Sequence, residues 1–190
     1  MIRSFPFLLA VAGVMALGGA TARAEDQPQW KWYEVKDGKV LIHLHVFWSR
    51  TCPHCASANS FLVGLQQRHD WLKVFHYEVS SNPANMDLYR RMAESIGRQA
   101  GSVPAFFYGK QLAIGYASDE TTGKRLEEVL LYYQRALQKQ VDDRRRKAPA
   151  AVLPLLFLPL LHPQAQSPEP EPDLEIPPPP PEQPTVDVPW

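Results

Sequence analysis

The sequence predicts one α/β domain in which a central mixed sheet is flanked by helices on both faces. Three observations support this prediction. Apolar residues alternate on both sides of 39–48, as in a strand that is covered on its two faces. Later stretches carry apolar stripes at helical spacing. The elements follow in the order strand, helix, strand, then helix, then two strands and a helix, which fits a parallel pair extended by an antiparallel hairpin.

The first half of this domain begins with a turn. Asp37-Gly38 marks that turn, and the strand 39–48 follows it. Pro53 then suits the first position of a helix, where its missing N–H costs nothing. The apolar stripe of this helix consists of Ala58, Phe61, Leu62 and Leu65.

The second half is predicted in the same way. The run 74–79 is expected to form a second strand, and Asn82-Pro83 is a cap with a first-turn proline for a helix that ends before Gly97. Gly109-Lys110 is expected to turn a hairpin. The strands of the hairpin are 103–108 and 111–117, and the final helix carries the stripe Leu126, Val129, Leu130, Tyr133 and Leu137.

The chain has two cysteines, Cys52 and Cys55, directly after the first predicted strand. They can form a structural disulfide, half of a metal site, or a redox dithiol. A bridge across so short a loop stabilises a protein by only about 2 kcal/mol. A structural zinc site needs four Cys or His ligands, and the sequence has no second CxxC or HxxxH pair. We therefore favour a redox dithiol, with no metal and no bound cofactor.

The chemistry of such a dithiol requires one ionised, accessible thiol. Cys52 stands at a helix start, where free N–H groups and the helix dipole favour an anion, so we expect it to be the nucleophile. Cys55, one turn inside, is expected to resolve the mixed disulfide. His54 is expected to stabilise the thiolate, the alternative being an ordinary exposed histidine. His43 and His45 form an HxH pattern, but no carboxylate or cysteine clearly joins them as a further metal ligand.

Several motifs together resemble those of thioredoxin-like thiol–disulfide oxidoreductases. They are Phe47-Trp48, Cys52-Pro53-His54-Cys55, Val103-Pro104 and Gly115, within roughly 40–139. The resemblance implies a thioredoxin-like fold, with Trp48 and Pro53 supporting the dithiol. It further implies that Pro104 is cis and lies beside the cysteines, and that the backbone of Val103 pairs with an extended substrate. The implied partners are protein thiols or disulfides.

Two departures from the family pattern concern the proton and the direction of exchange. Val46 occupies the position of a buried carboxylate that would accept the proton of the second cysteine, which leaves Glu78 or water as candidates. The Pro-His dipeptide resembles that of strongly oxidising members, but the interval from Cys55 to Pro104 cannot hold their inserted helical subdomain. Oxidant and reductase both remain open. A non-catalytic binding module with the same fold is the alternative function.

The amino-terminal residues 1–24 have the layout of a secretory signal peptide, with cleavage expected after Ala24. An uncleaved membrane anchor is the alternative. Export would place the cysteines where disulfides form, and the absence of a KDEL-type ending favours a bacterial periplasm over the endoplasmic reticulum. We expect no nucleic-acid partner.

The predicted domain covers 25–147, and 148–190 is expected to be a linker or disordered tail. Fourteen of the 19 prolines lie in 148–190, together with six acidic and no basic residues, so we expect an extended segment outside the core. Its apolar part, 148–161, is expected to dock on the domain, touch a membrane surface or bind a partner. The chain can therefore also be the soluble head of a larger, membrane-tethered electron-transfer protein with a membrane redox partner.

Overall fold

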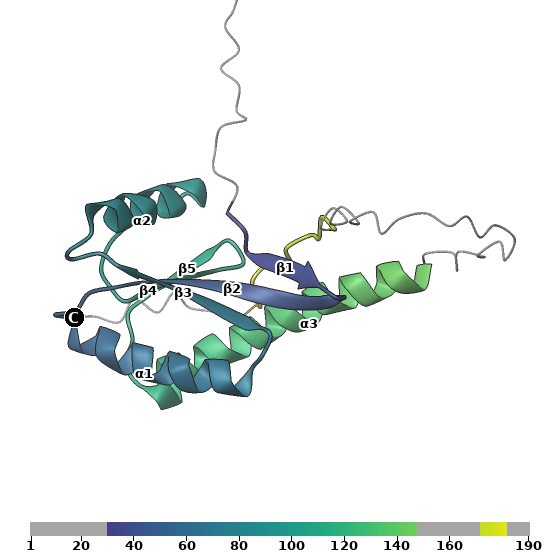
Figure 1. Ribbon diagram of the computed structural model, residues 1–190, viewed down its shortest axis with the longest axis horizontal. Coiled ribbons are helices and arrows are strands. Elements are labelled where there is room, and N and C mark those ends of the chain that lie inside the picture. The colour runs from purple at the N-terminus through teal and green to yellow at the C-terminus, as the bar shows by residue number, and fades with distance from the viewer. Residues whose placement is uncertain (1–29, 148–171, 182–190) are drawn as a thin grey trace, which may run out of the picture.

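A computed structural model describes residues 30–147 and 172–181 of the chain (Figure 1). The predicted signal peptide, the apolar run 148–161 and residues 182–190 lie outside this described part. No helix within it is long and apolar enough to cross a membrane. The elements are β1 Tyr33–Lys36, β2 Lys39–Trp48, α1 Pro53–Arg68, β3 Leu72–Glu78, α2 Pro83–Ser95, β4 Ala105–Tyr108, β5 Gln111–Ile114, a π-helix η2 Asp119–Gly123, and α3 Lys124–Lys147.

Strand β2 lies at the centre of the sheet. It pairs in parallel with β3 along one edge and antiparallel with β4 along the other. The hairpin partner of β4 is β5, and β1 pairs antiparallel with the first residues of β2. This arrangement is an α/β, thioredoxin-like fold, as the sequence predicts.

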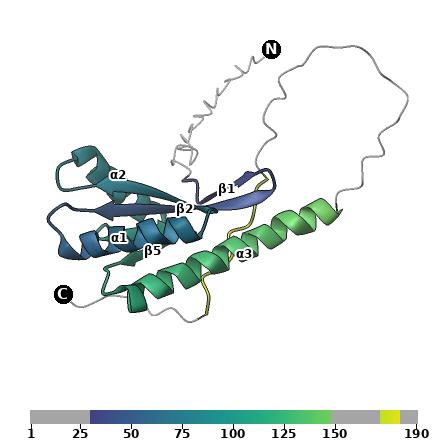
Figure 2. The ribbon, with the colours of Figure 1, turned by 60° about the horizontal axis from the view of Figure 1, so that its bottom comes forward.

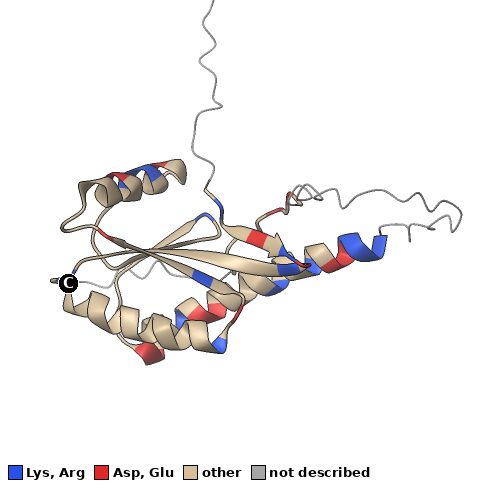
Figure 3. Cartoon of the chain, viewed as in Figure 1, with Lys and Arg blue, Asp and Glu red and all other residues tan. Residues whose placement is uncertain are grey.

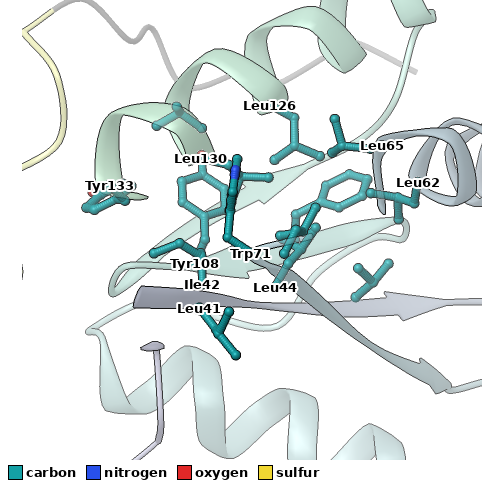
Figure 4. Close-up of a cluster of buried hydrophobic side chains, with 14 of the residues drawn as sticks. Leu41, Ile42, Leu44, Leu62, Leu65, Trp71, Tyr108, Leu126, Leu130 and Tyr133 are labelled. Atoms are coloured by element: carbon teal, nitrogen blue, oxygen red, sulfur yellow. The ribbon is translucent and has the colours of Figure 1, made fainter. Parts of the chain in front are cut away.

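The two faces of the sheet are covered by different helices (Figure 1). Helices α1 and α3 cover one face, where they enclose a core that includes Leu44, Leu62, Leu65 and Leu130 (Figure 4). Helix α2 covers the other face with Tyr89, Met92 and Ala93. Because β2 is central, both of its faces are buried, which explains why seven of its ten residues are apolar.

The element boundaries agree closely with the sequence where local signals are strong. Strand 39–48 and the start of α1 at Pro53 are confirmed. Helix α2 also begins as predicted, since the Asn82 side chain accepts hydrogen bonds from the N–H groups of Ala84 and Asn85. Strand β3 begins at Leu72, two residues before the predicted start, and both hairpin strands are shorter than predicted.

One expectation about the tail is wrong for residues 172–181, which we call the tail segment. The segment was expected to remain outside the core, yet Leu174 is only 4% exposed and belongs to the core under α1 and α3. The segment lies against β1 and α3 (Figure 2). The reason is local: Leu174 and Ile176 supply apolar side chains within an otherwise proline-rich and acidic stretch.

Candidate active site

The two cysteines lie where β2 passes into α1. Cys52 is the N-cap residue of α1, and Pro53 occupies its first turn. The Sγ atom of Cys52 accepts a hydrogen bond from the N–H of Cys55 at 3.2 Å. Both thiols are free, and Cys52 is partly exposed whereas Cys55 is fully buried. The fold therefore presents one thiol to solvent and places the other beneath it.

The short loop before Cys52 is held by its own hydrogen bonds. The hydroxyls of Ser49 and Thr51 lie 3.1 Å apart, and the N–H of Thr51 donates to the Ser49 hydroxyl at 3.3 Å. The N–H of Cys52 donates to the carbonyl of Ser49 at 3.2 Å. These bonds fix the direction in which the chain enters α1, so the position of Cys52 depends on the fold rather than on flexible loop geometry.

The Val103–Pro104 segment approaches the dithiol from the loop before β4. The Cys52 thiol donates to the carbonyl oxygen of Val103 at 3.5 Å, and the Val103–Pro104 peptide bond is cis. The Pro104 carbonyl accepts from the N–H of Gly115 at 2.8 Å, which ties this loop to the end of the hairpin. The structure thus brings Cys52 next to Val103 and Pro104, which lie about fifty residues later in the sequence.

Tyr89, a residue that the sequence alone did not single out, supports this loop. Its buried hydroxyl donates to the carbonyl of Ser102 at 3.0 Å and accepts from the N–H of Gly101 at 3.1 Å. A tyrosine in an apolar stripe needs a partner for its hydroxyl when it is buried, so that signal was available in the sequence. Tyr89 therefore positions the residues immediately before Val103.

Trp48 and His54 differ in burial and in their contacts with the rest of the protein. Trp48 ends β2 with its side chain partly buried, and its carbonyl accepts from the N–H of Val79 at 2.9 Å. His54 is exposed in the first turn of α1. Within the described residues its side chain makes no hydrogen bond or ion pair. Any effect of His54 on Cys52 must therefore act through space, across solvent.

The environment of Cys55 disfavours its ionised form. Burial first, and then the hydrogen bond with the Cys52 side chain, raise the pKa of the Cys55 thiol to about 12. A hydrogen bond with the backbone of Ser49 acts in the opposite direction. While Cys52 is a free thiol, Cys55 consequently keeps its proton at neutral pH.

Glu78 is a poor candidate for accepting that proton. Its carboxylate receives the N–H of Ser80 at 3.0 Å and that of Ser81 at 2.9 Å, together with both serine hydroxyls. These bonds, led by those of the Ser80 and Ser81 side chains, lower the pKa of Glu78 to about 2. At neutral pH Glu78 is ionised and engaged in closing the turn before α2, so it does not store a proton for exchange.

Asn59 is a second residue that the sequence analysis did not single out. It follows Cys55 by one helical turn on the same side of α1. Its Oδ1 atom is buried and has no hydrogen-bond partner among the described residues. A buried amide oxygen without a partner is uncommon. It can accept a hydrogen bond but, unlike a carboxylate, it cannot take up the proton of Cys55. In the sequence, the signal for Asn59 would have been a polar residue four positions after Cys55, where the helix places both on the same side.

The two strand histidines, His43 and His45, bond the backbone and neighbouring side chains, and the described residues contain no group of three potential metal ligands. Nδ1 of His43 and Nε2 of His45 both lie 3.2 Å from the carbonyl oxygen of Lys31. Nδ1 of His45 lies 3.2 Å from the Tyr77 hydroxyl, and the carboxylate of Glu34 faces His43 at 3.4 Å. Both imidazoles therefore hold the chain that leads into β1.

These histidines predict a loss of stability at mildly acidic pH. Burial lowers the pKa of both His43 and His45 from 6.5, although Glu34 and the Lys31 carbonyl oppose this at His43. The unfolded chain therefore takes up protons near pH 6.5 that the folded chain excludes. Stability present above pH 6.5 should fall as the pH drops through the folded-state pKa values, by about 1.4 kcal/mol for each unit of depression.

Urea unfolding between pH 7.5 and 5 measures this dependence. The double variant His43→Gln, His45→Gln should show a flatter profile than the parent. Burial also lowers the pKa of His76, so part of the slope should survive in the double variant. An unchanged slope in the double variant would contradict the assignment to this pair.

Comparison with known proteins gives a weak structural similarity only. No protein-family profile and no curated sequence matches the chain. A thioredoxin from Aeropyrum pernix is 15% identical over 54% of this chain and 98% of its own, with a TM-score of 0.34. A glutaredoxin from Archaeoglobus fulgidus is 21% identical over 42% of this chain and 82% of its own, with a TM-score of 0.30. The roles of individual residues thus have to be argued from the geometry of the site.

Proposed function

We propose that the chain is an exported thiol–disulfide oxidoreductase that exchanges disulfides with protein substrates through Cys52 and Cys55. The observation that carries the proposal is the asymmetry of the two thiols. Cys52 is partly exposed at a helix start beside Val103, whereas Cys55 is buried one turn below. A structural disulfide has no need of such an arrangement, while sequential attack by two thiols requires it.

The first step is attack by the Cys52 thiolate on a substrate disulfide. A bond forms between Sγ of Cys52 and one substrate sulfur, and the other substrate sulfur leaves as a thiolate. The N–H of Cys55, which already donates to Sγ, stabilises the attacking anion. The Val103 carbonyl, which accepts from the Cys52 thiol in this structure, becomes available for a main-chain hydrogen bond with an extended substrate peptide once Cys52 has lost its proton. Pro104 directly follows Val103, and Trp48 ends β2 just before the loop that leads to Cys52.

The second step is attack by Cys55 on the mixed disulfide. Two of the causes that raise the Cys55 pKa, the hydrogen bond and the charge interaction with Cys52, disappear when Cys52 is bonded to substrate. Cys55 then ionises more easily, forms the Cys52–Cys55 bond and releases the second substrate thiolate. Two electrons pass from the dithiol to the substrate. The reverse sequence oxidises a substrate dithiol.

The purified chain tests this proposal directly. With dithiothreitol as electron donor it should accelerate insulin reduction, and its disulfide form should oxidise a reduced, unfolded test protein. The double variant Cys52→Ala, Cys55→Ala is the matched control and should be inactive in both assays. Equal rates for the parent and the double variant would instead support a binding module. Export is tested separately, by locating the chain and its amino terminus in cell fractions.

His54 should influence the redox potential if it stabilises the Cys52 thiolate. In His54→Leu the reduced form loses that stabilisation, so the disulfide becomes less oxidising, by about 30 mV for each 1.4 kcal/mol lost. Equilibration with glutathione buffers measures the shift. His76→Leu removes a histidine of β3, outside the helix that carries the dithiol, and should leave the potential unchanged. A potential that His54→Leu does not move would make His54 an ordinary surface residue.

Asn59→Leu should leave the free energy of unfolding the same or raise it by about 1–2 kcal/mol. The substitution removes a buried amide oxygen that has no hydrogen-bond partner among the described residues. Urea unfolding of the parent and the variant measures the difference. A clear loss of stability would show that the Asn59 side chain is satisfied by a partner outside the described residues or by water.

A further inference from the structure

The tail segment is held by contacts that recognise its main chain. The hydroxyl of Tyr33 accepts from the N–H of Leu174 at 2.6 Å and lies 3.2 Å from the Leu174 carbonyl oxygen. The side-chain amide of Gln140 donates to the carbonyl of Glu175 at 2.7 Å and accepts from its N–H at 3.0 Å. Two side chains of the domain thus satisfy both polar groups of two successive residues, as in the binding of an extended peptide.

Further contacts extend this recognition along α3. Tyr132 donates its hydroxyl proton to the carbonyl of Pro178 at 3.1 Å, and the Arg144 guanidinium donates to the carbonyl of Asp173. The segment therefore crosses α3 from Arg144 through Gln140 to Tyr132, opposite to the direction of the helix (Figure 2). Aromatic hydroxyls that bond proline carbonyls are a common means of binding polyproline II peptides.

The side chains of the segment add selectivity to these backbone contacts. Leu174 is 4% exposed in the core, and Ile176 packs against both core clusters. Arg144, which bonds the Asp173 carbonyl, belongs to the basic last turn of α3, and Figure 3 shows Lys and Arg gathered at that end of the helix. Charge complementarity favours this register of the segment over its reverse.

Proline explains why such a segment can dock without joining the sheet. Six of the ten residues from Pro172 to Pro181 are prolines, which lack an N–H group. Few donors therefore lose water when the segment lies on the domain, and the polyproline conformation is already extended before binding. The same features would operate if the segment were not covalently attached.

We propose that the surface formed by Tyr33, Tyr132, Gln140 and Arg144 is a peptide-binding site for extended, acidic, proline-rich segments of the form Asp-Leu-Glu-Ile-Pro-Pro. Its resident ligand is this chain's own tail segment. The connection from Lys147 to Pro172 keeps that ligand at an effective concentration of about millimolar, so the site is filled in cis. The site is separate from the dithiol and does not depend on the proposed exchange activity.

Cleavage of the full chain tests whether the ligand binds without its tether. A specific protease site inserted between Gln164 and Ala165 allows the folded protein to be cut after purification. The released tail fragment should co-elute with the domain at about 100 μM on size exclusion, and a synthetic peptide of residues 168–181 should displace it. Complete separation at this concentration, with no binding of the peptide up to about 1 mM, would overturn the proposal.

Variants identify the surface. In the cut protein, Leu174→Ala should weaken retention of the fragment at least about 10-fold, since the buried anchor is lost. Tyr33→Phe keeps the ring and removes the hydroxyl, and Gln140→Ala removes the amide; each should weaken retention several-fold. Gln67→Ala, an exposed glutamine of α1, is the matched control and should have no effect. Retention that none of the three variants changes would place the fragment elsewhere and overturn the proposal.

Discussion

Replacing Cys55 with serine should convert the protein into a trap for its substrates. Cys52 remains able to attack a substrate disulfide, but the buried thiol that would resolve the mixed disulfide is gone. Release then depends on external thiols, which lack the high effective concentration of a group held one helical turn away. The lifetime of the adduct should rise at least about 100-fold.

The reciprocal variant makes the assignment of roles testable. Cys52→Ser leaves only Cys55, which is fully buried and whose pKa burial raises, so it should form almost no adduct. Mass spectrometry of each variant after incubation with a disulfide-bonded peptide, without reductant, counts the adducts. Dithiothreitol should release the peptide trapped by Cys55→Ser. Comparable trapping by Cys52→Ser would reverse the roles of the two cysteines.

Local signals account for the parts of the structure that could be predicted from the sequence. Strand β2 is buried on both faces and therefore mostly apolar, and α1 and α2 begin at residues whose capping chemistry can be read directly. The placement of Val103 near Cys52 followed from a family resemblance, since the two residues lie 51 positions apart and no local pattern connects them.

The features that could not be predicted depend on contacts between distant parts of the chain. Docking of the tail segment needs Tyr33 and Gln140, each far from it in the sequence. The high proline and acidic content of the tail gave no sign that Leu174, within the described segment 172–181, would be buried. From the sequence, Glu78 is a candidate proton acceptor because its side chain is a carboxylate. Its actual role is set by the serines that bond it, which only the folded turn reveals.

A core substitution at Phe47 should have the largest effect on stability. Phe47 is fully buried and stacks on Tyr77 and Tyr89 with ring centroids 4.9 and 4.8 Å apart, and it meets Phe107 edge-on at 5.5 Å. Phe47→Ala should lower the free energy of unfolding by about 3–5 kcal/mol. That is a large part of the roughly 5–15 kcal/mol of an ordinary domain.

The same substitution should also reach the active site through Tyr89. Phe47 supports the Tyr89 ring, and the Tyr89 hydroxyl holds Gly101 and Ser102, which lead directly into Val103. Under conditions where Phe47→Ala is still folded, its rate of disulfide exchange should fall. Tyr89→Phe keeps the ring and removes only the hydroxyl, so it should show a smaller loss of stability, about 1–3 kcal/mol, with a similar loss of exchange.

Phe75→Ala is the matched control for this prediction. Phe75 lies on β3 in the same ring cluster, in contact with His43 and His45, but it is 36% exposed. Its truncation leaves a surface notch rather than a cavity, so the loss of stability should be well below that of Phe47→Ala. Urea unfolding of the three variants, together with insulin reduction, measures both quantities. Equal destabilisation by Phe75→Ala and Phe47→Ala would show that the ring cluster stabilises the sheet as a whole. Unimpaired exchange in Tyr89→Phe would show that the loop before Val103 is positioned without the tyrosine hydroxyl.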